Sequence, residues 1–293
     1  MTSVAGTKSD CLQQCSEAFA SNLERTCTFA FAPAQIAYSV RRDQIMFDNA
    51  IFKITGKGGI DLEDFTKKPI EGVTEEVDRQ WKEFLQRPEE DQDKLVDRFG
   101  VGYVEKTSIN HPAIQDTLDA LYESIILGSW TAFETLAGDA WVALVNNGSP
   151  ELANKVSEAK KSREEEGYQS SYDIRTNLGE YLRDVRAYSF QKLYGIKTAY
   201  SVAMGKTKAG EIFATDGGRI VLLSALRNAI THSSGKVDKR FTDQAAMFPE
   251  LQGVRIGDSL SLNGELVSQM RFAAMETGVA ILNAIEEILS PQP

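Results

Sequence analysis

The chain has 293 residues, of which 42% are hydrophobic and 25% are charged, and its formal net charge is −10. These values are typical of a globular protein with one large domain or two small ones, and the acidic balance argues against indiscriminate nucleic-acid binding. No stretch approaches the ~20 apolar residues that a membrane span requires. The polar first residues lack the apolar core of a signal peptide, so we expect a cytoplasmic protein without a membrane partner.

All three cysteines, Cys11, Cys15 and Cys27, lie near the N-terminus. Cys11 and Cys15 are one helical turn apart, a spacing that could hold a metal only if other ligands such as His111 joined them. Thiols on helices are more often small buried hydrophobes, so this interpretation is favoured over a metal or redox role. We therefore predict no metal site, no cofactor and no disulfide framework.

The N-terminal part mixes helical and strand-like patterns. Residues 1–50 show a loose helical periodicity, whereas residues 51–60 alternate weakly and end in glycines, which predicts a short strand and turn. Thr74 begins a predicted helix, because Thr-Glu-Glu-Val is a capping sequence and an apolar stripe follows it.

A domain boundary is predicted after this mixed region. Residues 88–99 could form a further helix that begins at a proline, and residues 100–110 have the composition of a linker. We therefore expect an N-terminal extension of unknown role, mixed but largely helical, over residues 1–104 and a helical domain over residues 105–293.

The second domain begins with a long helix. Pro112 opens it and Asn147 closes it, which corresponds to about 52 Å at about 1.5 Å per residue. Apolar positions surround much of this helix, which indicates burial on more than one side, in a bundle or at a dimer interface. Its aromatic residues could stack on bases, but their helical spacing on an apolar stripe favours core packing; they are Tyr122, Trp130, Phe133 and Trp141.

The rest of the chain is predicted to be helical except for one hairpin. Residues 254–262 alternate around Gly257-Asp258, which predicts a small β-hairpin. The fold class is therefore mainly all-α, a helical bundle with one small hairpin. The further helices are expected over residues 150–163, over 177–205 with a break near 185–189, after Gly217-Gly218, and over 264–289.

The most informative stretch is the hexapeptide 227–232, Arg-Asn-Ala-Ile-Thr-His, which ends an apolar helix and precedes Ser-Ser-Gly, a glycine cap. At about 100° per residue, Asn228 and His232 share one face of this helix. An imidazole titrates near neutrality and a guanidinium can fork onto a phosphate, so the two side chains could serve phosphodiester chemistry without a metal. Alternatively, Arg227 pairs with an acid, Asn228 satisfies backbone groups and His232 complements the carbonyl end of the helix.

This hexapeptide in its helical setting resembles the RNxxxH motif of HEPN domains, an all-helical family. Residues 123–134 resemble the long early helix of such domains, and residues 190–200 resemble the middle helix of the bacterial defence-related branch. The resemblance covers residues 105–293. It implies a metal-independent endoribonuclease that acts as a homodimer on RNA, as a toxin or phage-defence effector with an antitoxin or regulatory partner.

The resemblance also implies roles for single residues. His232 would take or relay the proton of a ribose 2′-hydroxyl, Arg227 would stabilise charge on the phosphorane, and Asn228 would orient the pair. An acid of the early helix lies near the motif in such domains, and Glu134 is the candidate, with Arg227 as its expected partner. Alternatively, Glu134 is an ordinary acid on the helix surface.

A basic zone encloses the motif. Between Arg175 and Arg240 the chain carries twelve Lys or Arg against five acids, a net +7 that leaves −17 for the remainder. A polyanionic substrate would need this attraction near the motif. The expected substrate-binding residues are Lys236, Lys239, Arg240 and Ser233, although Ser233 could merely assist the helix cap.

Two other functions stay open at this point. The first is a non-catalytic HEPN-like module that binds a nucleotide, RNA or a protein in the same groove. The second is a helical scaffold whose basic zone and long helix serve assembly alone.

Overall fold

The chain is an all-α protein. In a computed structural model, residues 8–56, 70–86, 112–158, 177–184, 188–248, 251 and 253–290 are described. Within these ranges the elements are α-helices and one short 3-10 helix, without a strand, so the predicted class is confirmed. None of the described helices combines the length and the apolar character needed to cross a bilayer.

The chain divides into two compact units. Unit 1 contains residues 1–27 and 119–293, and unit 2 contains residues 28–118. The predicted linker, residues 100–110, and the predicted helix 88–99 both lie outside the described residues. Packing thus groups the first residues of the chain with its C-terminal part.

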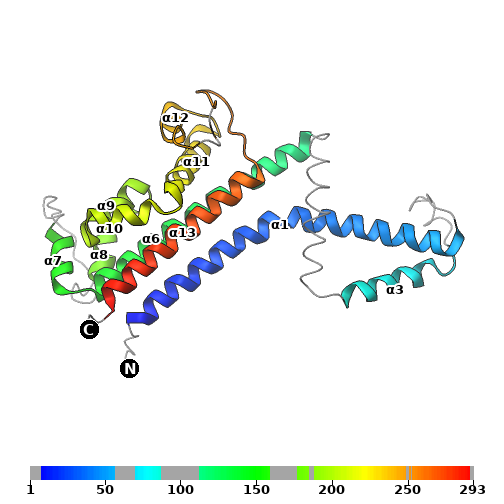
Figure 1. Cartoon of the computed structure of the whole chain (residues 1–293), viewed down its shortest axis with the longest axis horizontal. Helices are drawn as coiled ribbons and strands as arrows, with labels where there is room; N and C mark the ends of the chain where they lie inside the picture. The colour runs from blue at the N-terminus through cyan, green and yellow to red at the C-terminus, as the bar shows by residue number, and fades with distance from the viewer. Residues whose placement is uncertain are drawn as a thin grey trace. The chain divides into compact units, whose positions relative to one another are not determined.

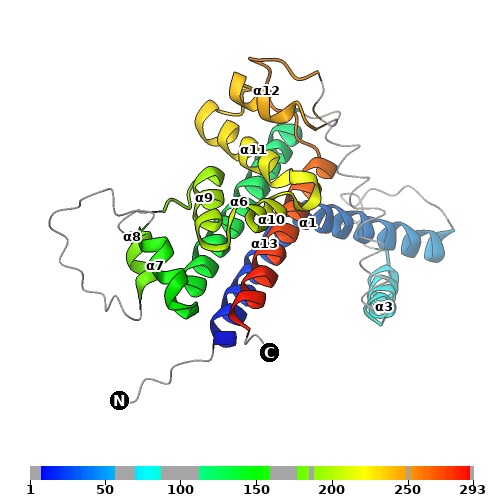
Figure 2. The same cartoon turned by 60° about the vertical axis from the view of Figure 1, so that its left-hand side comes forward.

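Three long helices run side by side through unit 1 (Figures 1 and 2). They are the first part of α1 (Lys8–Thr55), α6 (Pro112–Asn147) and α13 (Gly264–Leu289). Gly278 of α13 lies where they meet, because a Cβ placed on it would come within 2.5 Å of the Phe19 ring and 2.8 Å of Leu136. The absence of a side chain there allows the helices to approach closely.

The predicted long helix is confirmed as α6, and it is buried on several sides. Trp130, Phe133 and Trp141 are buried, which confirms core packing over base stacking for these three, whereas Tyr122 is half-buried. The Tyr200 hydroxyl donates to the Ala137 carbonyl at 2.8 Å, and the Trp141 indole N–H donates to the Ala199 carbonyl at 3.2 Å. These two buried hydrogen bonds fix α9 (Leu193–Met204) against α6.

Shorter helices complete unit 1. The break predicted near residues 185–189 is confirmed in part, because residues 188–192, between α8 and α9, are not helical. The Asn146 side chain of α6 holds α8, since its Oδ1 accepts from the Gly179 N–H at 2.7 Å and its Nδ2 donates to Glu180 at 2.6 Å. The remaining elements are α7 (Pro150–Glu158), α8 (Leu178–Asp184), α10 (Lys206–Phe213), the 3-10 helix η2 (Thr215–Gly218), α11 (Arg219–Ser233) and α12 (Lys239–Ala245).

The predicted β-hairpin over residues 254–262 is wrong. The segment makes a turn in which the Asp258 N–H donates to the Arg255 carbonyl at 3.1 Å, but no ladder follows. Its backbone pairs instead with the residues after α11: Val237 exchanges hydrogen bonds with Asp258 and Gly257 at 2.9 and 2.8 Å. The segment therefore bonds to the chain after α11 instead of to itself, with an isolated bridge between Lys236 and Ser259.

Unit 2 pairs the second part of α1 with α3 (Val73–Leu85). The strand predicted over residues 51–60 is wrong for the part that is described, because residues 51–55 form the end of α1. Ile51 is fully buried there, and a helix presents it to the same small core as Val73. Residues 57–60 lie outside the described chain. The helix predicted from Thr74 is confirmed as α3.

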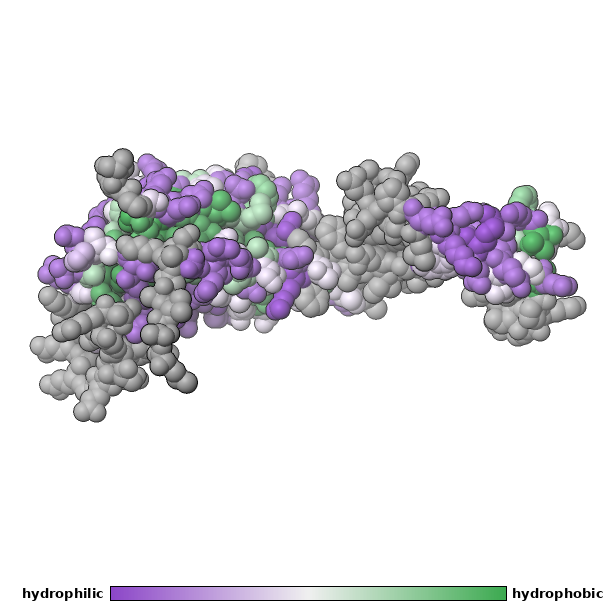
Figure 3. All heavy atoms as spheres, turned by 90° about the horizontal axis from the view of Figure 1, so that it is seen from below, coloured by the Kyte–Doolittle hydropathy of each residue, from purple (hydrophilic) through white to green (hydrophobic). Residues whose placement is uncertain are grey.

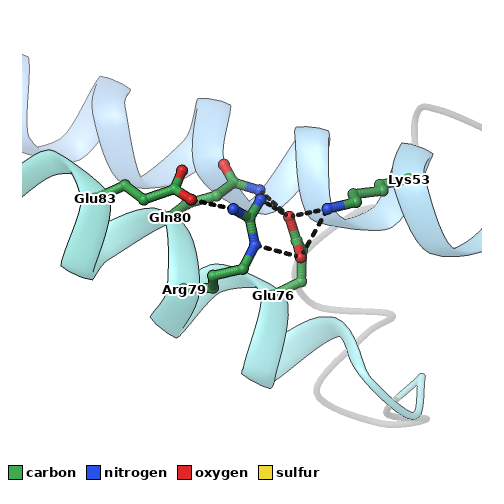
Figure 4. A network of polar contacts seen from close by, with 5 residues as sticks. All are labelled: Lys53, Glu76, Arg79, Gln80 and Glu83. Atoms are coloured by element: carbon green, nitrogen blue, oxygen red, sulfur yellow. Dashed lines mark hydrogen bonds and ion pairs between the residues drawn. The ribbon is translucent and has the colours of Figure 1, made fainter.

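A charged network joins the two helices of unit 2 (Figure 4). The Glu76 carboxylate accepts hydrogen bonds from Arg79 at 2.6 Å, from Lys53 at 3.0 Å and from Gln80 at 3.3 Å, and Arg79 also pairs with Glu83. These bonds, chiefly those from Arg79 and then Lys53, lower the pKa of Glu76 to about 2. The described surface of unit 2 is mainly hydrophilic in the view of Figure 3.

Candidate catalytic motif at the end of α11

Glycines and left-handed residues define both ends of α11. The helix follows Gly217 and Gly218, whose φ angles are 64° and 76°. Its last residue, Ser233, is followed by Ser234, with φ of 50°, and Gly235, with φ of 72°, and the Gly235 N–H closes the last turn onto the Ala229 carbonyl at 3.1 Å. The predicted cap is therefore present, with Ser234 rather than the glycine in the first left-handed position.

The buried face of α11 leaves the motif side chains at the surface. Leu222, Leu223 and Leu226 are fully buried, and α11 packs on α13 and α12. Arg227 and Asn228 are half-buried, whereas His232 is exposed. A helix with one buried apolar face and one polar face holds its last turns in place and keeps their polar groups accessible.

Asn228 positions Arg227 through a direct hydrogen bond. The Arg227 Nη1 donates to the Asn228 Oδ1 at 3.0 Å. The Thr231 hydroxyl donates to the Arg227 carbonyl at 2.8 Å, so its side chain is engaged by its own helix. Arg227 and His232 lie about 140° apart around the helix axis, because five residues separate them. They therefore leave the helix in different directions within one copy of the chain.

Glu134 contacts a tryptophan in place of its expected partner. Its carboxylate accepts a hydrogen bond from the Trp130 indole N–H at 2.7 Å, one turn earlier on α6. Among the described residues, no ion pair joins Glu134 to Arg227. Because a buried indole needs an acceptor for its N–H, the carboxylate has a structural role in unit 1.

Another acid of α6 lies close to the motif. A Cβ placed on Gly235 would lie 3.4 Å from the Glu123 Oε1, so this carboxylate adjoins the turn that follows His232. Glu123 precedes Glu134 by eleven residues, about three helical turns, so both carboxylates lie on nearly the same face of α6. The sequence thus indicates on which face of α6 the acid near the motif lies, but not at which turn of the helix.

The basic residues after the motif remain exposed. Lys236, Lys239 and Arg240 are exposed, and no ion pair links any of them to another described residue. Other cations of the basic zone are paired: Arg183 contacts Asp139 at 2.7 Å, and Lys208 contacts Glu287 at 2.7 Å. Lys236, Lys239 and Arg240 therefore form a group of exposed cations beside the motif, although Lys192 and Lys206 of the same zone are exposed as well.

Ser233 belongs to the end of the helix. It is half-buried, and its carbonyl accepts a hydrogen bond from the Lys236 N–H at 3.0 Å. That bond orders the turn that carries the first exposed lysine after the motif. The backbone of Ser233 thus assists the cap, and its hydroxyl remains a candidate contact for phosphate.

Cys11 and Cys15 show the features of packed thiols. Cys11 and Cys15 are free and half-buried. Burial, assisted by the nearby Asp139 and Cys11, raises the pKa of the Cys15 thiol to about 11, so it stays protonated near neutral pH. Among the described residues, no three His, Cys, Asp or Glu side chains are grouped closely enough to hold a metal ion. His111 lies outside the described residues.

Comparison with known proteins identifies no relative of the chain. No protein-family model, curated protein or solved structure matches the chain. The function is therefore proposed from the side chains at the end of α11 and from their surroundings.

Proposed function

We propose that the chain is a metal-independent endoribonuclease of HEPN type. The observation that carries the proposal is the end of α11, where Arg227 is hydrogen-bonded to Asn228 and His232 is exposed. The exposed cations of residues 236–240 follow directly, and they would attract an RNA backbone to the motif.

The chemistry needs only side chains of these types. His232 accepts the proton of a ribose 2′-hydroxyl, and the 2′-oxygen then attacks the adjacent phosphorus. The bond from phosphorus to the 5′-oxygen breaks, the leaving oxygen takes up a proton, and a 2′,3′-cyclic phosphate remains. Arg227 stabilises the charge on the phosphorane, and its hydrogen bond to Asn228 restricts its motion. DNA lacks the attacking oxygen and is not cleaved.

A homodimer would complete this site. Because Arg227 and His232 diverge by about 140° around α11, one phosphate is more easily held between residues of two copies. Two motifs facing one groove would supply an arginine from one protomer and a histidine from the other. The wider proposal is a cytoplasmic toxin or phage-defence effector that an antitoxin or regulatory protein holds in check.

Cleavage of mixed RNA in the presence of a chelator tests the activity. We expect the wild-type protein to produce fragments with cyclic phosphate ends, and Arg227→Ala and His232→Ala to lower the cleavage rate by about 100-fold or more. Thr231→Val is the matched control, because its hydroxyl bonds to its own helix. This variant should cleave like the wild type.

Other outcomes would assign a different function. If the folded protein cleaves no RNA, the proposed activity is wrong. RNA or nucleotide binding without cleavage, weakened in Lys239→Ala and Arg240→Ala, would support a non-catalytic module. Neither binding nor cleavage would favour a scaffold.

A further inference from the structure

An apolar stripe on α13, the C-terminal helix in Figure 1, remains at the surface of unit 1. Phe272 and Val279 are 47% and 44% exposed, and Met275 and Leu282 are half-buried. These four residues are spaced by three, four and three positions, so they lie within about 80° around the helix axis. Ile281, which follows Phe272 by nine residues and lies about 180° away, is fully buried. The stripe, defined by these four residues, is thus on the side of α13 that faces away from the core.

The spacing of the stripe is that of a coiled-coil seam. Apolar residues at alternating intervals of three and four let two helices pack along their length, because each side chain inserts between those of the partner helix. Contiguous exposed apolar residues indicate an interaction surface, whereas single ones are common on any protein. A second helix with the same spacing would cover the whole stripe.

Charges of opposite sign lie at the two ends of the stripe. Arg271 directly precedes Phe272, and Glu286 follows Leu282 by four residues. Arg271 is half-buried and Glu286 is exposed, and neither side chain forms an ion pair or a hydrogen bond with another described residue. By contrast, Glu287 is paired with Lys208 of α10 at 2.7 Å. The stripe therefore carries a positive charge at its N-terminal end and a negative charge at its C-terminal end.

We propose that the stripe binds the same stripe of a second copy of the chain, with the two helices antiparallel. If the twofold axis passes near Thr277, Phe272 of each copy faces Leu282 of the other, and Met275 faces Val279, so all four residues are covered. Arg271 of one copy and Glu286 of the other then differ by only about 4.5 Å along the helix axis, within reach of the arginine side chain. A parallel pairing would instead bring like charges together at both ends, which is unfavourable.

This interface is separate from the motif. A Cβ placed on Gly264 would lie 3.6 Å from the Tyr122 hydroxyl, and Gly235 adjoins Glu123, the next residue of α6, so the end of α11 lies near the N-terminal end of α13. Antiparallel pairing about Thr277 places the two Gly264 residues about 39 Å apart along the helix axis. It therefore does not bring two motifs together, and it does not depend on the proposed ribonuclease activity. A pairing of motifs would be a second interface, and both interfaces together would join more than two chains.

Sedimentation of the full chain without RNA tests the proposal. We expect the wild type to have at least twice the mass of one chain at micromolar concentration. Val279→Glu should raise the dissociation constant by about 100-fold or more and halve the observed mass, because both copies then bury a carboxylate at the centre of the interface. Tyr194→Glu is the matched control: Tyr194 is 82% exposed on α9, and this variant should keep the mass of the wild type.

Charge reversal tests the antiparallel direction. Arg271→Glu and Glu286→Arg should each weaken association by about three- to ten-fold, and the double variant should restore it, because opposite charges then face each other again. Glu276→Gln, which removes a charge outside the stripe, should not weaken association. Circular dichroism checks that each variant is folded. A monomeric wild type, an unchanged mass in folded Val279→Glu, or a double variant weaker than both single variants would overturn the proposal, whatever the result of the RNA cleavage assay.

Discussion

The two units use helices of similar character but are stabilised differently. Unit 1 is built on large aromatic residues that are fully buried, such as Trp141 and Tyr200, whose polar atoms donate to carbonyls of neighbouring helices. Unit 2 has a described core of only four buried apolar residues, Phe47, Ala50, Ile51 and Val73, beside a charged network around Glu76. Burial dominates the stability of the first unit, whereas ionisation contributes to that of the second.

The largest expected effect is loss of an aromatic core residue in unit 1. Trp141 is fully buried and packs on Tyr188 and Phe190 with ring centroids 4.9 and 5.5 Å away. Trp141→Ala should lower the free energy of unfolding by about 3–5 kcal/mol, measured by urea denaturation. Tyr194→Ala is the control, because Tyr194 is 82% exposed and should change stability little. Equal losses in the two variants would contradict the assignment of the core.

A second experiment tests the close approach of the long helices. Gly278→Ala would place a methyl group within 2.5 Å of the Phe19 ring, so it should lower the free energy of unfolding by about 1–3 kcal/mol. The control is Gly210→Ala in α10, where nothing lies within 4 Å of the added carbon and a helix gains about 0.5–1 kcal/mol. The two substitutions should therefore change the melting temperature in opposite directions, and a shared sign would argue against the contact.

A smaller effect is expected from one buried hydrogen bond of unit 1. Tyr200→Phe removes the hydroxyl that donates to the Ala137 carbonyl at 2.8 Å. The free energy of unfolding should fall by about 0.5–1.5 kcal/mol, because a single neutral hydrogen bond is lost and the ring stays in place. Thermal unfolding followed by circular dichroism measures this change. A variant as stable as the wild type would show that the hydroxyl adds nothing.

The smallest expected effect is a pH dependence of stability that should distinguish unit 2 from unit 1. The pKa of Glu76 is lowered from 4.5 to about 2 in the folded chain, so its stabilisation is complete above pH 4.5 and is lost as the pH falls through about 2. The protection factors of the α3 amides, which are relative to the intrinsic exchange rate at each pH, should fall over this pH range in the wild type. Glu76→Gln should show faster exchange already at neutral pH and a flatter response to acid.

Glu83→Gln provides the comparison for this pH experiment. The Glu83 carboxylate is 60% exposed and pairs only with Arg79 among the described contacts, so solvent screens it strongly. Its variant should keep the acid response of the wild type. If the α3 amides exchange alike in Glu76→Gln and Glu83→Gln, the charged network does not distinguish unit 2 from unit 1.

Local sequence signals determined much of the helical framework. Pro112 begins α6, the glycines before Arg219 begin α11, and Asn263 caps α13, where its side chain accepts from the Leu266 N–H at 2.8 Å. These signals act within one turn of the chain, because they satisfy or remove backbone groups that a helix end leaves free. The same holds for the motif, whose exposed position follows from the apolar run before it and the cap after it.

Contacts between distant segments decided the rest. Residues 51–55 continue α1 because Ile51 is buried in one core with Val73, and the residues around Gly257 pair with the chain after α11 instead of with themselves. Glu134 bonds to Trp130, while Glu123, three turns earlier, adjoins the end of the motif. The sequence by itself determined most of the helices and the position of Arg227, Asn228 and His232 at the end of one of them. Only the tertiary structure decided which acid adjoins the turn that follows them, because periodicity specifies the face of a helix but not the turn at which another element crosses it.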